Sequence, residues 1–281
     1  MHSILITGGT GSFGQAFVRR LLADYSYDRI CIFSRGEHAQ AAMRQALKDD
    51  KRLRFFIGDI RDKERLTRAC RGVDTLVHAA ALKRIEVGAY NPDEMVKTNV
   101  LGAMNVIDAA IANGVKRVVA LSTDKAYQPI SPYGQTKALA ESLFLNANDI
   151  HGTDAPMFSV TRYGNIWNAS GSVVPTWHAL LAAGAKVLPV TDGRATRFFM
   201  WLEDAVDLVL NTLDHMPAHV VIPRDLPAYQ LDTLAAAFGM PYSESGMPPW
   251  EKLHESMDDS LCSDTARRMT VDELREELRR G

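Results

Sequence analysis

Hydrophobic residues gather in short, nearly continuous runs along the first half of the chain. Runs of this length are too short for helices, and their unbroken hydrophobicity is typical of strands that are covered on both faces. Helical patterns, such as those of Ser12–Ala23 and Asn91–Asn113, lie between them. The alternation predicts repeated β-α-β units and a parallel, doubly wound α/β sheet. The predicted strands are Ser3–Thr7, Arg29–Ser34, Arg54–Ile57, Thr75–Ala79, Arg117–Leu121 and Met157–Thr161.

The pattern becomes less regular after Gly164, where prolines are scattered and the alternation weakens. We find no flexible linker and expect a smaller C-terminal region, residues 165–281, that packs directly on residues 1–164. A segment near residues 196–215 is expected to return to the first region. The tail TVDELREELRRG opens with a capping box at Thr270 and Glu273, which predicts a solvated helix. A subunit contact is the alternative.

Composition limits the class of protein. The chain has 281 residues, 46% of them hydrophobic, and a net charge of −2 that is spread along the sequence, so we expect no nucleic-acid partner. Three widely spaced cysteines indicate reduced thiols. No apolar run approaches the ~18–20 residues needed to span a bilayer, and the first strand begins with no signal peptide before it. We expect a cytoplasmic protein without a membrane partner.

The first strand runs into the glycine-rich turn TGGTGSFG. Gly8, Gly11 and Gly14 allow a tight turn and a close approach of backbone amides to a pyrophosphate at the start of a helix. The intervening Thr10, Ser12 and Phe13 share this turn. Strand, glycine turn and helix in this order predict a Rossmann-type dinucleotide-binding domain over residues 1–164.

The ends of the next strands indicate which dinucleotide is bound. Sites for NAD place an acidic residue after the second strand, but this chain has Ser34 and Arg35 there. A guanidinium suits a 2′-phosphate, so NADP is favoured over NAD. Asp59, followed by Ile60, could accept a hydrogen bond from the adenine amino group. The small residues Ala79, Ala80 and Ala81 leave room for the cofactor, and His78 before them is expected to be a packed strand residue.

The stretch STDKAYQPISPYGQTK, which follows the fifth strand, contains two tyrosines. Tyr133 and Lys137 are four residues apart in a predicted helix that begins at Pro132, and therefore share one face. A nearby ammonium group and an oxidised nicotinamide would lower the pKa of Tyr133, making it the better base. Thr123 could donate to the same substrate oxygen. Tyr127 has no lysine one turn later and is expected to be a packing aromatic.

These motifs, together with FIGDIRD, HAAALK, RYGN, GSVVP, TRFF and EKLHE, resemble the extended short-chain dehydrogenase/reductases. More narrowly, the chain is similar to the inverting UDP-N-acetylglucosamine 4,6-dehydratases. The Asp124-Lys125 pair and the short gap to Tyr133 are the marks of that group. The resemblance implies a nucleotide-sugar substrate, NADP as cofactor, a homo-oligomer and no metal.

The resemblance also implies roles for individual residues. Tyr133 would take the proton of the sugar 4-hydroxyl, Lys125 would take the C5 proton, and Asp124 would protonate the departing 6-hydroxyl. Lys125 must then be partly neutral, which burial or a nearby Lys137 could achieve. Additional cofactor contacts are implied for Lys83, Asn99, Ser122, Tyr133 and Lys137, and substrate contacts for Lys83, Asn165, Val173, Arg197 and Lys252.

Alternatives remain open at this stage. The family's Arg-Pro-Gly appears as Pro248-Pro249-Trp250, and an arginine expected before GSVVP appears as Ser170. Arg197 and Lys252 remain as candidates for contacts to the nucleotide phosphates. The chain could also be an epimerase, a dehydratase that stops at the 5,6-alkene, or a non-catalytic NADP-binding protein.

Overall fold

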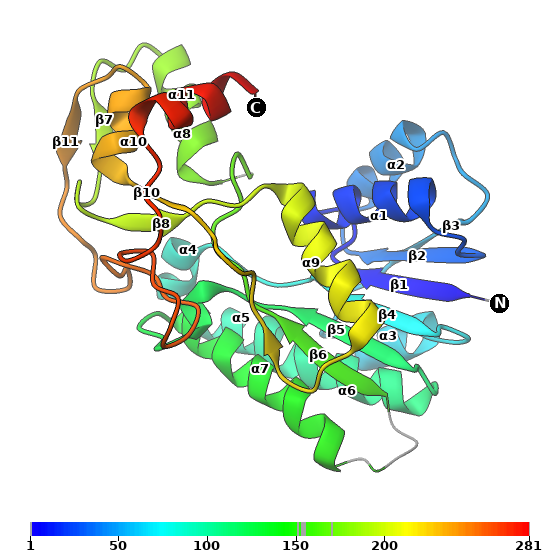
Figure 1. Cartoon of the computed structure of the whole chain (residues 1–281). Coiled ribbons are helices and arrows are strands. Elements are labelled where there is room, and N and C mark those ends of the chain that lie inside the picture. Colours follow the sequence, from blue (N-terminus) through cyan, green and yellow to red (C-terminus); the bar gives the residue numbers. More distant parts are fainter. Residues whose placement is uncertain (1, 151, 153–155, 170, 281) are drawn as a thin grey trace.

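A seven-stranded parallel sheet forms the centre of the molecule (Figure 1). The computed structural model describes residues 2–150, 152, 156–169 and 171–280, so Ser170 lies outside the described residues. The strand order is β3-β2-β1-β4-β5-β6-β9. All six predicted strands are confirmed to within one residue, whereas the two-residue β9 was not predicted. The strands are β1 (Ser3–Thr7), β2 (Arg29–Ser34), β3 (Leu53–Ile57), β4 (Thr75–His78), β5 (Arg117–Leu121), β6 (Met157–Thr161) and β9 (Val220–Val221).

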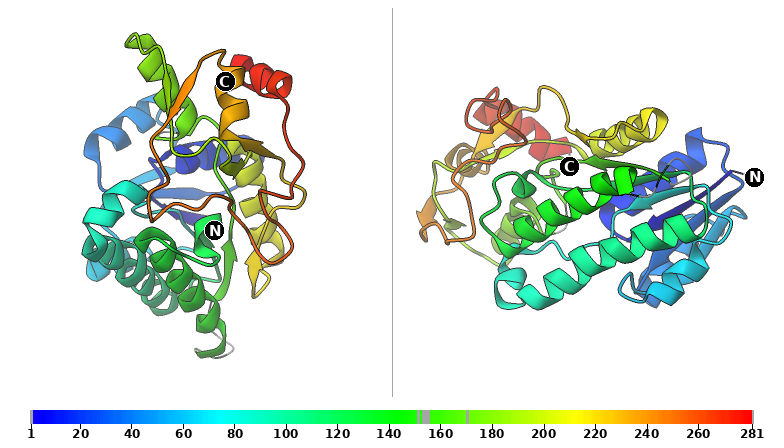
Figure 2. Two further views of the ribbon diagram at one scale, coloured as in Figure 1. Left: turned by 90° about the vertical axis from the view of Figure 1, so that its left-hand side faces the viewer. Right: turned by 90° about the horizontal axis from the view of Figure 1, so that it is seen from below.

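Helices cover both faces of this sheet (Figures 1 and 2). On one face α1 (Ser12–Asp24), α2 (Glu37–Ala46) and α9 (Leu202–His215) bury residues such as Phe17 and Val209 against Ile4 and Ile32. On the other face α3 (Lys63–Ala69), α6 (Gly102–Ala112) and α7 (Pro132–Ile150) bury residues such as Phe144 against Leu5 and Leu76. This burial on both faces is the reason why the strands are hydrophobic throughout.

The region predicted as one helix over Asn91–Asn113 is interrupted. It consists of α5 (Pro92–Met95), a π-helical turn (Val96–Leu101) and α6, and it follows the short α4 (Ile85–Tyr90). Within the π-helical turn Asn99 is buried, and its side chain both accepts from Leu82 N and donates to Leu82 O, each at 2.9 Å. The turn therefore fastens the loop that follows β4.

The remaining elements form a smaller part with its own core at the carboxyl ends of the sheet strands (Figure 1). Two small sheets pair β7 (Leu188–Val190) with β11 (Tyr242–Glu244) and β8 (Thr196–Phe198) with β10 (Ala228–Gln230). The helices are α8 (Val173–Ala182), α10 (Leu231–Ala237) and α11 (Val271–Arg280). Helix α11 begins with the predicted capping box, but it is not fully solvated, because Leu274 is buried in this core.

The chain passes between the two parts more than once. Helix α9 packs on α1, β5 and β6, and β9 completes the central sheet, whereas Thr196–Phe198 pairs within the smaller part. Among the helices of the described residues, none combines the length and the apolar character needed to cross a membrane.

Candidate active site

The glycine-rich turn after β1 forms a tight backbone cradle. Gly8 has φ +68°, and a Cβ atom there would lie 2.8 Å from the nitrogen of Ala80. A Cβ atom on Gly14 would lie 2.4 Å from Cα of Gly9, so only glycine lets α1 start so close to the turn. Gly11 is the N-cap, with no side-chain cap and no acidic residue in the first turn of α1. These backbone amides fit the pyrophosphate of a dinucleotide.

The remaining residues of the cradle line the same turn. The carbonyl of Thr10 accepts from Gln15 at 2.9 Å, and Phe13 stacks on Phe17 with ring centroids 5.4 Å apart. His78 is buried and its Nδ1 lies 2.8 Å from the Thr7 hydroxyl, which confirms that it is a packed strand residue. Other predicted contacts at these strand ends are Ser12 at the start of α1 and Ala79, Ala80 and Ala81 after β4.

The ends of β2 and β3 carry an arginine and an acid side by side. Arg35 has an exposed side chain, and its Nη1 lies 4.0 Å from Oδ2 of Asp59. Asp59 is also held by Arg61, whose Nη2 lies 2.7 Å from the same oxygen. Ser34 is fixed by Gln40, which donates to both its carbonyl and its hydroxyl at 3.0 Å, and Ile60 is buried beneath. The carboxylate is thus already paired, while the guanidinium of Arg35 is exposed.

The turn after β5 is held from both sides. Ser122 N donates to Thr161 O at 2.6 Å and Asp124 N donates to Tyr163 O at 3.1 Å, which ties this turn to the end of β6. Helix α7 begins at Pro132 as predicted, with Ser131 Oγ accepting from Gly134 N at 3.1 Å. A Cβ atom on Gly134 would lie 2.2 Å from Lys125 O. The helix and the Asp124–Lys125 turn are therefore in direct contact.

Tyr133 is buried in this contact, and burial raises its pKa to about 12. Lys125 and the hydrogen bond with Thr123 act in the opposite direction but do not outweigh burial. The expected partner Lys137 instead donates to Leu121 O at 2.6 Å, and burial lowers its own pKa to about 8, against the opposing effect of Glu141. The lysine that acts to lower the pKa of Tyr133 is thus Lys125 rather than Lys137. The predicted net lowering includes the charge of an oxidised nicotinamide and stays a prediction.

Lys125 lies at the centre of a buried polar cluster. Its Nζ is 3.0 Å from Asp124 Oδ1, 3.1 Å from Asn165 Oδ1 and 3.5 Å from Glu255 Oε1. Burial by itself would lower the pKa of Lys125, but the carboxylates of Asp124 and Glu255 raise it overall. The prediction of a partly neutral Lys125 is wrong here, because two buried acids hold the ammonium form.

The basic residues expected to bind the substrate are also engaged with the protein. The buried Arg197 pairs with Glu251 and donates to the carbonyls of Thr196, at 2.7 Å, and Leu253, at 3.1 Å. Lys252 Nζ donates to Tyr127 O at 2.6 Å. In the loop after β4, burial, reinforced by the charge of Arg84, lowers the pKa of Lys83.

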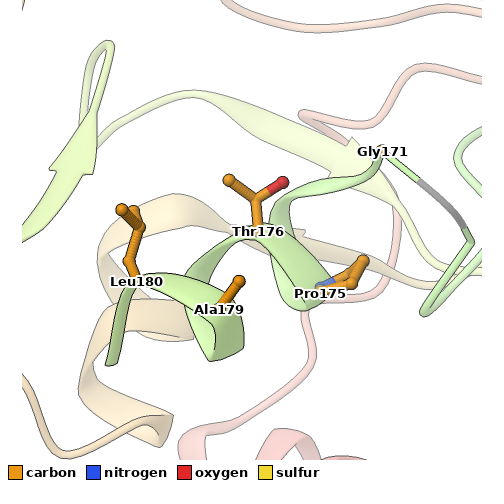
Figure 3. Close-up of a pocket in the computed structure, with 5 residues that line it drawn as sticks. All are labelled: Gly171, Pro175, Thr176, Ala179 and Leu180. Atoms are coloured by element: carbon orange, nitrogen blue, oxygen red, sulfur yellow. The ribbon is translucent and has the colours of Figure 1, made fainter. Parts of the chain in front are cut away.

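Val173 is the first residue of α8 and packs against the core of the smaller part. A hollow of about 420 Å³ runs along this helix (Figure 3). The hollow is mainly apolar, with one hydroxyl group among its lining side chains. Its lining residues are Gly171, Pro175, Thr176, Ala179 and Leu180.

Tyr127 lies at the edge of the cluster. Its hydroxyl bonds to the carboxylate of Asp259, and the guanidinium of Arg162 lies 5.7 Å from the centre of its ring. Its ring packs as expected, although the residue is not part of a core. Sequence reasoning missed Glu255, for which the only signal was its place in the motif EKLHE.

Comparison with known proteins places the chain among sugar-nucleotide enzymes. A family model described as "Polysaccharide biosynthesis protein" matches residues 4–272. An inverting UDP-N-acetylglucosamine 4,6-dehydratase of Campylobacter jejuni is 48% identical over 257 residues, which cover 91% of this chain and 77% of the relative. A UDP-glucose 4-epimerase of Rickettsia conorii is 43% identical over 238 residues, which cover 84% of this chain and 69% of the relative.

Solved structures agree with this placement. Pen from Bacillus thuringiensis superimposes with a TM-score of 0.92 at 29% identity, and the match covers 100% of this chain and 98% of that one. The dTDP-glucose 4,6-dehydratase DesIV from Streptomyces venezuelae, solved with NAD bound, superimposes with a TM-score of 0.84 at 25% identity. That match covers 99% of this chain and 96% of the other.

Proposed function

Because the chain belongs to the polysaccharide biosynthesis protein family of extended short-chain dehydrogenase/reductases, we propose that it is an NADP-dependent nucleotide-sugar 4,6-dehydratase. The proposed substrate resembles UDP-N-acetylglucosamine, and the configuration at C5 is inverted. The observation that carries this proposal is the buried contact of 3.0 Å between Asp124 and Lys125, on the turn that packs against Tyr133. An acid and a base at one point are what an elimination of water requires.

The cofactor would be held by the glycine cradle and by the strand ends. Gly8, Gly11 and Gly14 suit the pyrophosphate, and the exposed Arg35 suits a 2′-phosphate. Asn99 supports the loop after β4 rather than reaching out, since its side chain is bonded to Leu82. NADP held there would supply a reversible hydride acceptor for the oxidation at sugar C4 and the reduction at C6.

The chain's own residues move the protons. Tyr133 must first lose its own proton to solvent, and the positive charge of a bound oxidised nicotinamide would favour this phenolate form against the effect of burial. The phenolate would then take the proton of the 4-hydroxyl. Lys125 is an ammonium and Asp124 accepts its hydrogen bond at 3.0 Å, so the transfer of one proton from Nζ to Oδ1 creates a neutral amine and a carboxylic acid together. The amine then removes the C5 proton, and Asp124 protonates the departing 6-hydroxyl.

Substrate contacts are proposed for Asn165 and Lys83 near the reacting sugar, and for Val173 at the start of α8. Arg197 and Lys252 would contribute positive charge from positions that their protein partners fix. We propose residues 1–164 as the cofactor domain and 165–281 as mainly the substrate region, with residues near 196–215 returning to the cofactor domain.

We also propose a homo-oligomer that works in the cytoplasm. Leu101, Met104 and Leu139 leave 47%, 45% and 50% of their surface exposed, respectively, which supports self-association. The free thiols of Cys31, Cys70 and Cys262 suit a reducing compartment.

The test of activity is incubation with NADP and a panel of nucleotide sugars, with products followed by mass spectrometry. Loss of one water from UDP-N-acetylglucosamine is the expected result. An unchanged mass with an inverted C4 would instead indicate an epimerase, the second candidate, which the similarity to the Rickettsia relative favours. Binding of NADP without turnover of any sugar would contradict both.

Calorimetry with NADP and NAD tests the cofactor. The wild type is expected to bind NADP more tightly, and Arg35→Asp should reverse the preference, because the new carboxylate repels a 2′-phosphate and accepts from a ribose hydroxyl. Tighter binding of NAD by the wild type would exclude this assignment.

A further inference from the structure

Glu255 is a buried carboxylate that lies between two lysines. It comes from the segment between β11 and α11, and only 2% of its surface is exposed. Oε1 lies 3.5 Å from Lys125 Nζ, and Oε2 lies 3.6 Å from Lys252 Nζ. Oε2 has no hydrogen-bond partner among the described residues. Such a carboxylate is costly to bury unless nearby cations compensate for its charge.

The backbone of Glu255 is fixed where it enters the site. Its N–H donates to Ser263 Oγ at 2.9 Å, and its carbonyl accepts from Ser263 N at 2.7 Å. Ser263 Oγ is in turn 2.7 Å from the hydroxyl of Thr196 on β8. These hydrogen bonds fix the backbone of Glu255 so that its carboxylate lies next to Lys125. The two residues are more than a hundred positions apart in the sequence.

The charged groups around Lys125 determine how firmly it holds its proton. Asp124 and Glu255 stabilise its ammonium form, and Arg197 opposes them. The phenols of Tyr133 and Tyr229 also lie within range of its charge. Asp124 and Lys125 share one proton in the proposed reaction, and that proton leaves with the 6-hydroxyl as water. Were it lost to solvent beforehand, the amine would remain a base but no acid would remain to protonate the leaving group.

We propose that Glu255 is a positioning residue whose negative charge, held against Lys125, keeps the proton shared by Asp124 and Lys125 within the site until elimination. This inference rests on the proposed dehydratase activity. All protons are accounted for while Glu255 stays ionised. Lys125 passes its proton to Asp124, the freed electron pair on Nζ takes the C5 proton, and the C5–H pair forms the C5=C6 bond. The C6–O bond then breaks as Asp124 delivers its proton, and the pair regains its original charges.

The test compares two steps of one reaction over a pH range. Single-turnover experiments with NADP and UDP-N-acetylglucosamine give the rate of C4 oxidation by absorbance and the formation of dehydrated sugar by mass spectrometry. In Glu255→Gln, the alkaline fall in elimination should move to lower pH by about one unit or more, because one negative charge near Lys125 is lost. The pH profile of C4 oxidation, which depends on Tyr133, should not move.

Two further variants separate charge from shape. Glu255→Asp keeps the charge on a shorter side chain, so its alkaline fall should stay close to that of the wild type even if the maximal rate drops. Asp259→Asn removes an exposed carboxylate from the same segment and should leave both profiles unchanged.

An unshifted elimination profile in Glu255→Gln would overturn the inference. So would equal shifts in the Gln and Asp variants, or parallel losses of oxidation and elimination in both, because these point to shape rather than charge. If the wild type itself forms no dehydrated sugar, the proposed function fails instead, so the two failures are distinguishable.

Discussion

At the scale of single residues, the stretch that follows β5 carries two tyrosines, Tyr127 and Tyr133, and of these two only Tyr133 is buried. Tyr133→Phe should abolish oxidation at C4, because no other group replaces its hydroxyl. The loss should be at least the ~10²–10⁴-fold typical of a general base. Tyr127→Phe should change activity far less, since its hydroxyl bonds only to Asp259 and Gln128 among the described residues. Stopped-flow measurement of NADPH formation distinguishes the two; an inactive Tyr127→Phe with an active Tyr133→Phe would reverse the assignment.

Lys125→Ala should separate oxidation from elimination. C4 oxidation can still occur, but the C5 proton has no base, so 4-keto sugar and NADPH should accumulate in a single turnover. Exchange of the C5 proton with deuterated solvent should be lost, as mass spectrometry would detect. Normal exchange in this variant would show that another group is the base. Because Lys125→Ala leaves Asp124 and Glu255 without their shared cation, binding of NADP by the variant must be verified first.

The identities of these residues could be predicted from sequence, but their charge states could not. The spacing of Tyr133 and Lys137 places both on the buried face of α7, as the structure confirms. The prediction of a partly neutral Lys125 was wrong, because its charge state depends on the carboxylates of Asp124 and Glu255. The pKa of Tyr133 depends on burial as well as on a nearby lysine. No local pattern reveals a partner that lies 130 positions further along the chain.

At the scale of elements, Gly14 controls how closely α1 approaches the first turn. In Gly14→Ala the new methyl group would lie 2.4 Å from Gly9 Cα, so backbone must move. Such overpacking typically costs ~1–3 kcal/mol of unfolding free energy and should weaken NADP binding as well. Gly36→Ala is the matched control, because its nearest neighbour would be the Ala39 methyl at 3.5 Å and its φ is −84°. Equal unfolding temperatures and NADP affinities for both variants would contradict this role.

Elements with a strong hydrophobic pattern could be predicted, and weak ones could not. The six strands within residues 1–164 are nearly continuous apolar runs. Strands β7 to β11 have only two or three residues each, which is too short for a hydrophobic period to be recognised. The π-helical turn at Val96–Leu101 is likewise invisible in a helical pattern. It accompanies a tertiary contact, the hydrogen bonds between Asn99 and Leu82.

At the scale of the whole molecule, the site depends on chain crossings. Lys125 lies in the turn after β5 of the central sheet, whereas Glu255 lies in the segment between β11 and α11. The change of composition along the sequence predicts two regions that meet at residue 164, and this division stays a prediction. The segment expected to return, near residues 196–215, contains α9, which packs on the central sheet. The return of the two-residue β9 was not expected, because long-range packing decides where so short a strand lies.

The outer side of the molecule leads to a last prediction, on self-association. Helices α6 and α7 pack beside each other, and Leu101, Met104 and Leu139 on and next to them remain about half exposed. We take these exposed apolar groups on two neighbouring helices as the surface that another copy would cover. Leu139→Glu should therefore shift the protein to a smaller species, because a carboxylate would have to be buried at that contact.

Light scattering across a concentration series measures the size of this species. Ile57→Glu is the control, since Ile57 is similarly exposed at 49% but lies at the end of β3. A wild type that stays monomeric at all concentrations, or equal effects of the two substitutions, would exclude this surface as the site of assembly.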